Sequence, residues 1–100
     1  MYKKLKKLSR KEFRRKVGVK KDTFKKMVNI LEEKELLDKG NKGGRPHSFT
    51  IENRLLMSLE YLREYRTYFY IATSYGLSES SCYRNIRWIE NVLIKHPSLT

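Results

Sequence analysis

A strip of polar side chains lies in the segment GLSESSCYRNIRWIE, residues 76–90. At ~100° per residue, one side of a helix there carries Ser80, Arg84 and Arg87. Ser81 and Tyr83 flank this strip, so hydroxyl and guanidinium groups lie close together. Arg84 could donate two parallel hydrogen bonds to a guanine edge, and the hydroxyl groups could reach phosphates or an exchangeable base edge. Asn91 continues the strip but lies too far along, because the first turns of a recognition helix enter the groove. For any single arginine, the alternative is a solvated surface charge.

The residues before this strip fit a helix-turn-helix corner. Such a corner needs a small residue where the helices cross, a residue that tolerates positive φ in the turn, and an apolar seam on the second helix. Ala72 and Gly76 meet the first two needs. The seam follows at spacings of four, three and four residues: Cys82, Ile86, Ile89 and Leu93. Plain structural corners have the same spacing, and the basic charge of the chain favours the DNA-binding alternative.

Three helices are needed to position this corner, and the sequence contains signals for all of them. Thr50 can cap a helix over about 50–66, along which apolar residues repeat at helical spacing: Ile51, Leu55, Leu59 and Leu62. A short second helix ends at Gly76, which can take the left-handed conformation that closes helices. Ser78 then caps the third helix. No segment alternates with period two, so we expect an all-α fold with a three-helix unit at residues 49–100.

Positive charge is concentrated near the N-terminus. The 100 residues include 23 Lys and Arg against 11 Asp and Glu, a formal net charge of +12. Residues 1–26 hold 13 of the basic residues and two acids, whereas residues 49–100 are nearly neutral. Because such a surplus favours a polyanionic partner, we expect phosphate contacts from four lysines: Lys20, Lys21, Lys25 and Lys26. The lysines before them predict a loose basic arm: Lys3, Lys4, Lys6 and Lys7.

Composition argues against several other classes of protein. The chain is too short for a large enzyme, and it lacks the paired carboxylates or Cys/His and Ser/His sets that mark catalytic sites. Cys82 is the only cysteine, which excludes a disulfide framework, and no Cys/His spacing fits zinc. No apolar run approaches the ~20 residues of a membrane span, and the lysine-rich start lacks the apolar core of a secretory signal. We therefore expect an intracellular protein with no cofactor, metal site, catalytic residue or membrane partner.

The N-terminal residues repeat the corner pattern in a shorter form. When Gly18 is placed on Gly76, VGVKKDTFKKMV (17–28) aligns with YGLSESSCYRNI (75–86) without a gap. Apolar positions then coincide in three pairs: Val19 with Leu77, Phe24 with Cys82, and Val28 with Ile86. We expect residues 1–37 to form a basic helical subdomain. It is either a second helix-turn-helix or a helix pair that packs against the other three helices.

A glycine-rich segment separates the two halves. DKGNKGGRPHS, residues 38–48, has three glycines, a proline and no apolar anchor, so we expect a flexible linker. Within it, GGRP resembles the core of minor-groove hooks, in which an arginine lies extended along narrow A·T-rich DNA. Arg45 is therefore a candidate minor-groove contact. The alternative is a flexible joint in which Pro46 delays the next helix.

Three stretches are distinctive when taken together: FRRKVGVKKDTFKKMV, KGGRP, and TIENRLLMSLEYLREYRTYFYIATSYGLSESSCYRNIRWIENVLI. They resemble the N-terminal DNA-binding region of insertion-sequence transposases of the DDE superfamily, and the resemblance covers nearly the whole chain. It implies sequence-specific binding of double-stranded DNA at the terminal inverted repeats of a mobile element, in the cytoplasm and nucleoid of a prokaryote. The resemblance leaves open whether the protein is a homodimer.

In that family a following RNase H-like domain cuts and joins DNA with three carboxylates and divalent metal. That domain is absent from this chain, so we expect no enzymatic activity here, and a separate or downstream catalytic domain as a partner. The acids present are scattered, and three of them are interpreted as a solvated face: Glu32, Glu33 and Glu35. Lys20 stands where the family often has a capping serine or threonine, which makes the first corner less secure than the second.

Two other functions fit the same residues. A stand-alone transcriptional regulator would use the same corner and bind paired half-sites as a dimer. Trp88 and Val92 beside the seam could form a dimer contact or could equally seal the core of one molecule. A basic RNA-binding protein would use exposed aromatic side chains, and the seven tyrosines allow this, although most fall at the spacing typical of packed helices.

Overall fold

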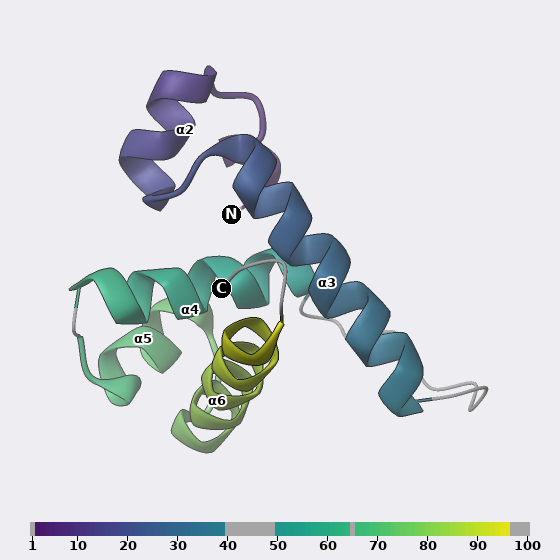
Figure 1. Cartoon of the computed structure of the whole chain (residues 1–100). Helices are drawn as coiled ribbons and strands as arrows, with labels where there is room; N and C mark the ends of the chain where they lie inside the picture. The colour runs from purple at the N-terminus through teal and green to yellow at the C-terminus, as the bar shows by residue number, and fades with distance from the viewer. Residues whose placement is uncertain (1, 40–49, 65, 97–100) are drawn as a thin grey trace.

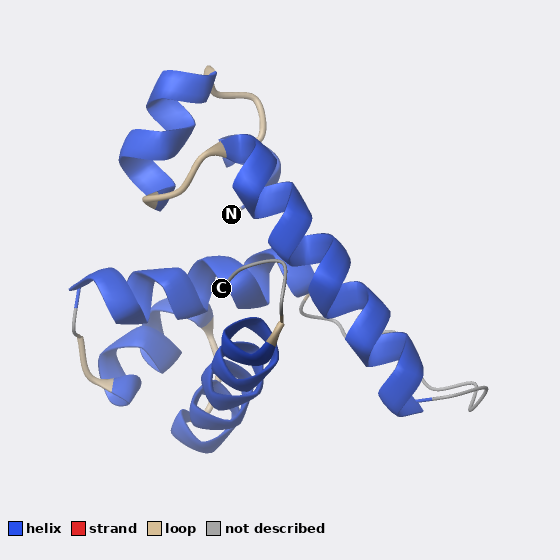
Figure 2. Ribbon diagram, in the orientation of Figure 1, coloured by secondary structure: helices blue, strands red, loops and turns tan. Residues whose placement is uncertain are grey.

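The computed structural model describes residues 2–39, 50–64 and 66–96, and over these ranges the chain forms helices and no strand (Figure 1, Figure 2). The helices are α1 (Tyr2–Leu5), α2 (Arg10–Val17), α3 (Lys21–Lys39), α4 (Ile51–Glu64), α5 (Tyr68–Tyr75) and α6 (Glu79–Lys95). The expected all-α fold is therefore confirmed. α3 includes the first two residues of the expected linker at 38–48, and the rest of that segment, Arg45 included, lies outside the described residues.

The start and stop signals predicted for the C-terminal helices are confirmed. Thr50 Oγ1 accepts a hydrogen bond from the Asn53 N–H at 3.2 Å where α4 begins. Gly76 closes α5 with a φ of 69°, a conformation that costs glycine little because it has no Cβ. Ser78 Oγ accepts from the Ser81 N–H at 3.1 Å and caps α6. α4 ends at Glu64, slightly before the predicted end, and its predicted stripe residue Leu62 is exposed.

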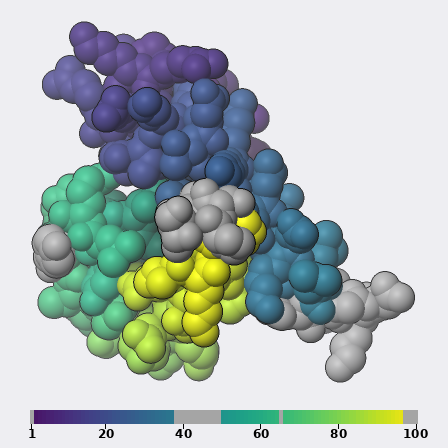
Figure 3. Space-filling view, viewed as in Figure 1, coloured from purple at the N-terminus to yellow at the C-terminus, as the bar shows by residue number. Residues whose placement is uncertain are grey.

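Two clusters of buried side chains hold the helices together. The smaller cluster lies within the corner, where α4, α5 and α6 meet: Met57, Ile71, Ala72, Cys82 and Ile86. The larger cluster joins both halves of the chain: Phe13, Val17, Phe24, Val28, Leu31, Ile51, Leu55, Leu56 and Ile89. The N-terminal helices therefore share a core with α4 and α6, and Figure 3 shows them as a purple and blue lobe above the green surface of the C-terminal half.

The expectation of a loose basic arm at the N-terminus is wrong. α1 is packed in place, because the Tyr2 ring stacks on Phe24 with centroids 5.3 Å apart. The Tyr2 N–H also donates to Asn53 Oδ1 at 3.1 Å, which ties α1 to α4. Tyr2 and Leu5 are about one helical turn apart, so they bury one side of α1 while the lysines beside them stay exposed.

The interpretation of Glu35 as part of a solvated face is also wrong. Its Oε2 accepts from Arg54 Nη1 at 2.7 Å, and the Arg54 side chain is only 7% exposed. The Arg54 guanidinium lies 4.7 Å from the centroid of the Trp88 ring. One arginine of α4 thus contacts both α3 and α6, which shows that Trp88 helps to seal the core of a single molecule. Glu32 and Glu33 are exposed, as expected.

Candidate nucleic-acid interface

α6 presents the predicted polar strip to solvent. Ser80, Tyr83, Arg84 and Arg87 are exposed, and Ser81 is half-buried. The opposite side of the helix is closed, because the seam residues Cys82, Ile86 and Ile89 are at most 2% exposed. Leu93, the last seam residue, is partly buried against the larger cluster. The seam therefore fixes the rotation of α6 and leaves the side that bears the two arginines uncovered.

Hydrogen bonds among the side chains order the first turn of α6. Ser78 Oγ donates to Ser81 Oγ at 2.9 Å, in addition to accepting from the Ser81 N–H. Asn85 Nδ2 donates to the Ser81 carbonyl oxygen at 2.9 Å, one turn further along. Ser81 therefore belongs to the cap at the start of the helix and is also a predicted DNA contact.

Tyr83 is oriented by an aromatic cluster beneath it. The Tyr68 ring packs edge-on against Tyr83 at 5.2 Å and stacks on Tyr61 at 4.5 Å. The hydrogen bond to Tyr61, followed by burial, raises the pKa of Tyr68 to about 12, so this side chain stays neutral at physiological pH. Beside it an open hollow of about 420 Å³ lies at the start of α6, lined by Tyr68, Glu79, Ser80, Tyr83 and Arg84.

Cys82 is the first residue of the buried seam of α6. It is 0% exposed and lies among Met57, Ile71, Ala72 and Ile86. Burial, with a further contribution from the Glu79 carboxylate, raises the pKa of the Cys82 thiol. The thiol is therefore protonated at neutral pH and packs as a small apolar group.

The four lysines predicted to contact phosphates lie around the start of α3. Lys20, Lys25 and Lys26 are exposed. Lys21 is half-buried, because its Nζ donates to the Lys6 carbonyl oxygen at 3.0 Å and lies 5.9 Å from the centroid of the Phe13 ring. Lys21 thus also holds the end of α1 against α3.

Further cations that the sequence reasoning missed lie on α2, opposite these lysines. They line an open hollow of about 620 Å³ together with Lys20, Lys21 and Asp22: Arg10, Lys11, Arg14 and Arg15. Arg10 and Asp22 form an ion pair at 3.2 Å in which both side chains are more than two-thirds exposed, so its contribution to stability is small. The spacing of these residues in the sequence could have identified them, because Arg10 and Arg14, like Lys11 and Arg15, are about one helical turn apart.

Arg66 is another exposed cation that the sequence reasoning missed. It lies just before α5, and its guanidinium is 4.4 Å from the centroid of the Tyr70 ring. In helix-turn-helix complexes the first helix of the pair crosses the DNA backbone. A stacked arginine at the start of that helix is suited to a phosphate contact, because guanidinium groups bind phosphates with two parallel hydrogen bonds.

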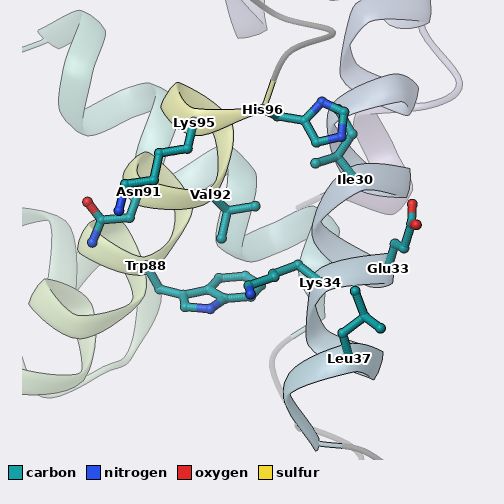
Figure 4. A pocket seen from close by; sticks show the side chains of 9 residues that line it. All are labelled: Ile30, Glu33, Lys34, Leu37, Trp88, Asn91, Val92, Lys95 and His96. Atoms are coloured by element: carbon teal, nitrogen blue, oxygen red, sulfur yellow. The ribbon is translucent and has the colours of Figure 1, made fainter.

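A second, more apolar groove lies between α3 and the C-terminal part of α6, with a volume of about 470 Å³ (Figure 4). Trp88 and Val92 of α6 extend toward α3, where Lys34 and Leu37 line the facing wall. None of the described residues predicted to contact DNA lines this groove. In the ranges that the structure describes, no helix combines the length and apolar character needed to cross a membrane.

The structure brings together the strip on α6 but places it apart from the lysines. α6 begins at the bottom of Figure 1, whereas α3 begins at the top beside α2. The two sets of predicted contacts therefore lie at different ends of the molecule. Arg45, the predicted minor-groove contact, lies outside the described residues.

Comparison with known proteins identifies two similarities. The family model described as "Helix-turn-helix of DDE superfamily endonuclease" matches residues 47–99. The chain is 43% identical over 91 residues to the "Probable transposase for insertion sequence element IS702" of Microchaete diplosiphon. This similarity covers 91% of the chain and 32% of the relative, so the chain spans about a third of the length of that curated relative. No solved structure shows significant similarity.

Proposed function

The chain belongs to the family of helix-turn-helix domains of DDE superfamily endonucleases, and from this premise we propose that it recognises a specific double-stranded DNA sequence at the ends of a mobile element. The relative named as a transposase for an insertion sequence element supports this choice of target. The observation that carries the proposal is the two-sided character of α6. Its seam is buried, and Ser80, Arg84 and Arg87 lie exposed on the side that a groove would receive.

In this proposal the first turns of α6 enter a major groove. The Gly76 corner sets the angle at which α6 leaves α5, and Arg84 donates to the O6 and N7 of a guanine. Such a bidentate contact discriminates against the wrong base by roughly 1 to 3 kcal/mol. Arg87 extends the readout by one turn, while Ser80, Ser81 and Tyr83 contact phosphates or an adjacent base edge.

The rest of the molecule holds the DNA backbone. Lys20, Lys21, Lys25 and Lys26 neutralise phosphates next to α3, and Arg45 lies in an adjacent minor groove. These contacts add affinity for any duplex, whereas the contacts of α6 distinguish one sequence from another. The target is a terminal inverted repeat, and the protein acts on the chromosome of a prokaryotic cell.

In this proposal the described helices serve to bind DNA. Cutting and joining belong to a catalytic domain that acts with this module, either in the same polypeptide or as a separate chain.

A binding titration tests the proposal. Duplexes that carry the ends of related insertion elements are compared with scrambled duplexes of the same composition, each at two salt concentrations. Arg84→Ala should reduce the preference for the element ends by about 5- to 150-fold, the ratio that corresponds to one bidentate base contact. Lys95→Ala removes one positive charge from the far end of the same helix and should leave the preference unchanged.

Three outcomes would count against the proposal. Equal binding of element ends and scrambled duplexes by the wild-type chain would exclude sequence-specific recognition. An unchanged preference after Arg84→Ala would remove α6 as the reading helix. A stoichiometry of two chains on each palindromic site, with no preference for element ends, would favour a dimeric transcriptional regulator instead.

A further inference from the structure

The N-terminal helix pair repeats the α5–α6 pair element by element. α2 and α5 have eight residues each. When the sequence is aligned so that Gly18 matches Gly76, the first and last residues of α2 match the first and last residues of α5. Their caps follow the same shift, because Ser9 Oγ accepts from the Glu12 N–H at 3.2 Å and Thr67 Oγ1 accepts from the Tyr70 N–H at 3.1 Å. The first residues of α3 and α6, Lys21 and Glu79, correspond as well, so the two connecting turns have the same length.

The turns and the buried seams of the two pairs also coincide. Gly18 has a φ of 95° and Gly76 a φ of 69°, and both lie in the left-handed region. Under the same shift, buried residues correspond along both helices: Phe13 with Ile71, Phe24 with Cys82, Val28 with Ile86, and Leu31 with Ile89. Because the buried residues of α3 have the same spacing as those of α6, the corresponding positions on the two helices face solvent.

The two pairs differ at the point where their helices cross. Arg14, which is exposed, occupies the position of the buried Ala72. α2 instead crosses α3 through an aromatic contact, in which Phe13 packs edge-on against Phe24 with centroids 5.4 Å apart. The larger side chains keep the second core closed without the small residue.

The outward side of α3 carries side chains that can read base edges. Lys25, Lys26 and Asn29 correspond to the strip residues Tyr83, Arg84 and Arg87, and all of them are exposed. Asparagine forms two hydrogen bonds with the edge of adenine. The position that holds an arginine on α6 thus holds an asparagine on α3, which predicts a different base preference.

Cations gather more densely at the start of α3 than in the hollow at the start of α6. The hollow between α2 and α3 is lined by Arg14, Arg15 and Lys20 among other basic residues. α2 occupies the place in its pair that α5 occupies in the other, where a helix crosses the DNA backbone. The charge therefore lies where a second helix-turn-helix would meet phosphates.

We propose that α2 and α3 form a second DNA-reading unit, in which α3 enters a major groove with Asn29 at the base edges and its lysines on the neighbouring phosphates. The inference rests on the proposed function, because it assigns a second part of the same duplex site to the N-terminal helices. The longest dimension of the molecule is 39 Å, and successive major grooves on one face of DNA are ~34 Å apart. A molecule of this length is long enough to place one helix in each of two such grooves, so the proposed target consists of two short blocks of specified bases about one helical turn apart.

In vitro selection from duplexes with a random central region tests this inference on the full chain. The wild-type chain should select two blocks with centres about 10 base pairs apart. Arg84→Ala should weaken the preference in one block, and Asn29→Ala should weaken it in the other, by about 5- to 150-fold at the contacted base pair. Asn91→Ala is the matched control, because Asn91 is an exposed asparagine at the far end of α6, and it should leave both blocks intact.

The possible failures are distinguishable. A single block that is lost with Arg84→Ala and kept with Asn29→Ala would overturn the second reading unit and leave the proposed function standing. If the wild-type chain selects no block at all, both the second reading unit and the proposed function are wrong. Circular dichroism checks that each variant keeps its helices.

Discussion

Gly18 and Gly76 form the turns of the two helix pairs. Their surroundings differ, so replacement by alanine should destabilise the protein more at one glycine than at the other. An alanine with positive φ is strained by ~1 kcal/mol. A Cβ on Gly76 would meet nothing within 4 Å, whereas a Cβ on Gly18 would lie 3.1 Å from Arg63 Nη1. The φ of 95° at Gly18 also lies further from the left-handed minimum than the 69° of Gly76 does. Gly18→Ala should therefore lower the free energy of unfolding by about 2 kcal/mol and Gly76→Ala by about 1 kcal/mol.

Urea unfolding of both variants measures this difference. The steric part of the Gly18→Ala cost should disappear when Arg63→Ala is added, since that change removes the opposing guanidinium. Equal costs at the two glycines would mean that Arg63 moves aside freely and that the backbone alone decides.

Tyr75 makes stability sensitive to alkaline pH. Burial, followed by the nearby Glu60 carboxylate, raises the pKa of Tyr75 from 10.0 to about 12. The unfolded chain therefore loses the phenol proton at a lower pH than the folded chain does. The contribution of Tyr75 to stability is complete below pH 10 and is lost as the pH rises through about 12.

Measuring the melting temperature as the pH rises from 10 to about 12 tests whether ionisation of Tyr75 lowers stability. Tyr75→Phe should give a shallower fall in stability between pH 10 and about 12 than the wild type. Below about pH 9 the two proteins should keep a constant difference, because Tyr75 is then neutral in both states. A steeper alkaline fall in the variant would contradict the raised pKa.

At the residue scale, local signals could be predicted from the sequence and contacts across the fold could not. Ser78 and Gly76 act within one turn of their own positions, so their residue type and spacing were enough to predict the helix cap and the turn. The role of Lys21 depends on the Lys6 carbonyl oxygen, which becomes a neighbour only because α1 forms. The exposure of Arg84 follows from the seam on its own helix, whereas the support of Tyr83 by Tyr68 depends on how α5 packs.

At the element scale, Arg54 joins three helices. Its guanidinium pairs with Glu35 of α3 and lies over Trp88 of α6, and its Nε is buried without a hydrogen-bond partner among the described residues. Arg54→Ala should lower the free energy of unfolding by about 2 to 4 kcal/mol, because it leaves a cavity and removes a close ion-pair partner of a partly buried carboxylate. Arg54→Met should cost less, since the side-chain stem is retained.

Arg87→Ala is the matched control for these variants in chemical denaturation, because Arg87 is exposed on α6 and its loss should change stability by less than about 0.5 kcal/mol. A double-mutant cycle with Glu35→Gln separates the ion pair from the packing of Arg54. A cost for Arg54→Ala no larger than that of Arg87→Ala would show that α3 is held by its apolar contacts alone.

The helices themselves were largely predictable, and their partners were less so. α5 and α6 follow from caps, a glycine and an apolar seam within one stretch of sequence. α1 was missed because two apolar residues among lysines carry little periodicity, and its stability comes from Phe24 and Asn53 at a distance. Glu35 was misplaced for the same reason, since its partner lies beyond the glycine-rich segment and no local pattern identifies it.

At the scale of the whole molecule, the shared core predicts that both halves unfold together. Phe24 and Leu31 of α3 lie in one cluster with Leu55 of α4 and Ile89 of α6. Trp88, the only tryptophan, lies beside that cluster and reports on the contact between the halves. Urea denaturation followed by tryptophan fluorescence and by far-ultraviolet circular dichroism should therefore give coincident curves. Two separate transitions would mean that residues 1–37 and 49–100 fold independently.

The distribution of charge over the whole molecule predicts how DNA binding responds to salt. Each phosphate that a cation neutralises releases counterions, which adds about −0.9 to the slope of log K against log salt concentration. With cations of α2 and α3 on the backbone, contact with roughly six phosphates would give a slope of about −5. Lys20→Ala should make this slope shallower by about 0.9, since Lys20 is exposed beside α3, whereas Lys95→Ala should leave it unchanged.

Arg84→Ala is the third variant to measure in the same salt titrations, beside Lys20→Ala and Lys95→Ala. If Arg84 reads a base, its loss should reduce the preference between sequences while the salt slope stays near that of the wild type. The two lysine variants carry equal charge but lie at different places, so they separate local phosphate contacts from net charge. An equal change of slope for Lys20→Ala and Lys95→Ala would show that total charge governs affinity, and the assignment of the backbone contacts to the N-terminal helices would then be wrong.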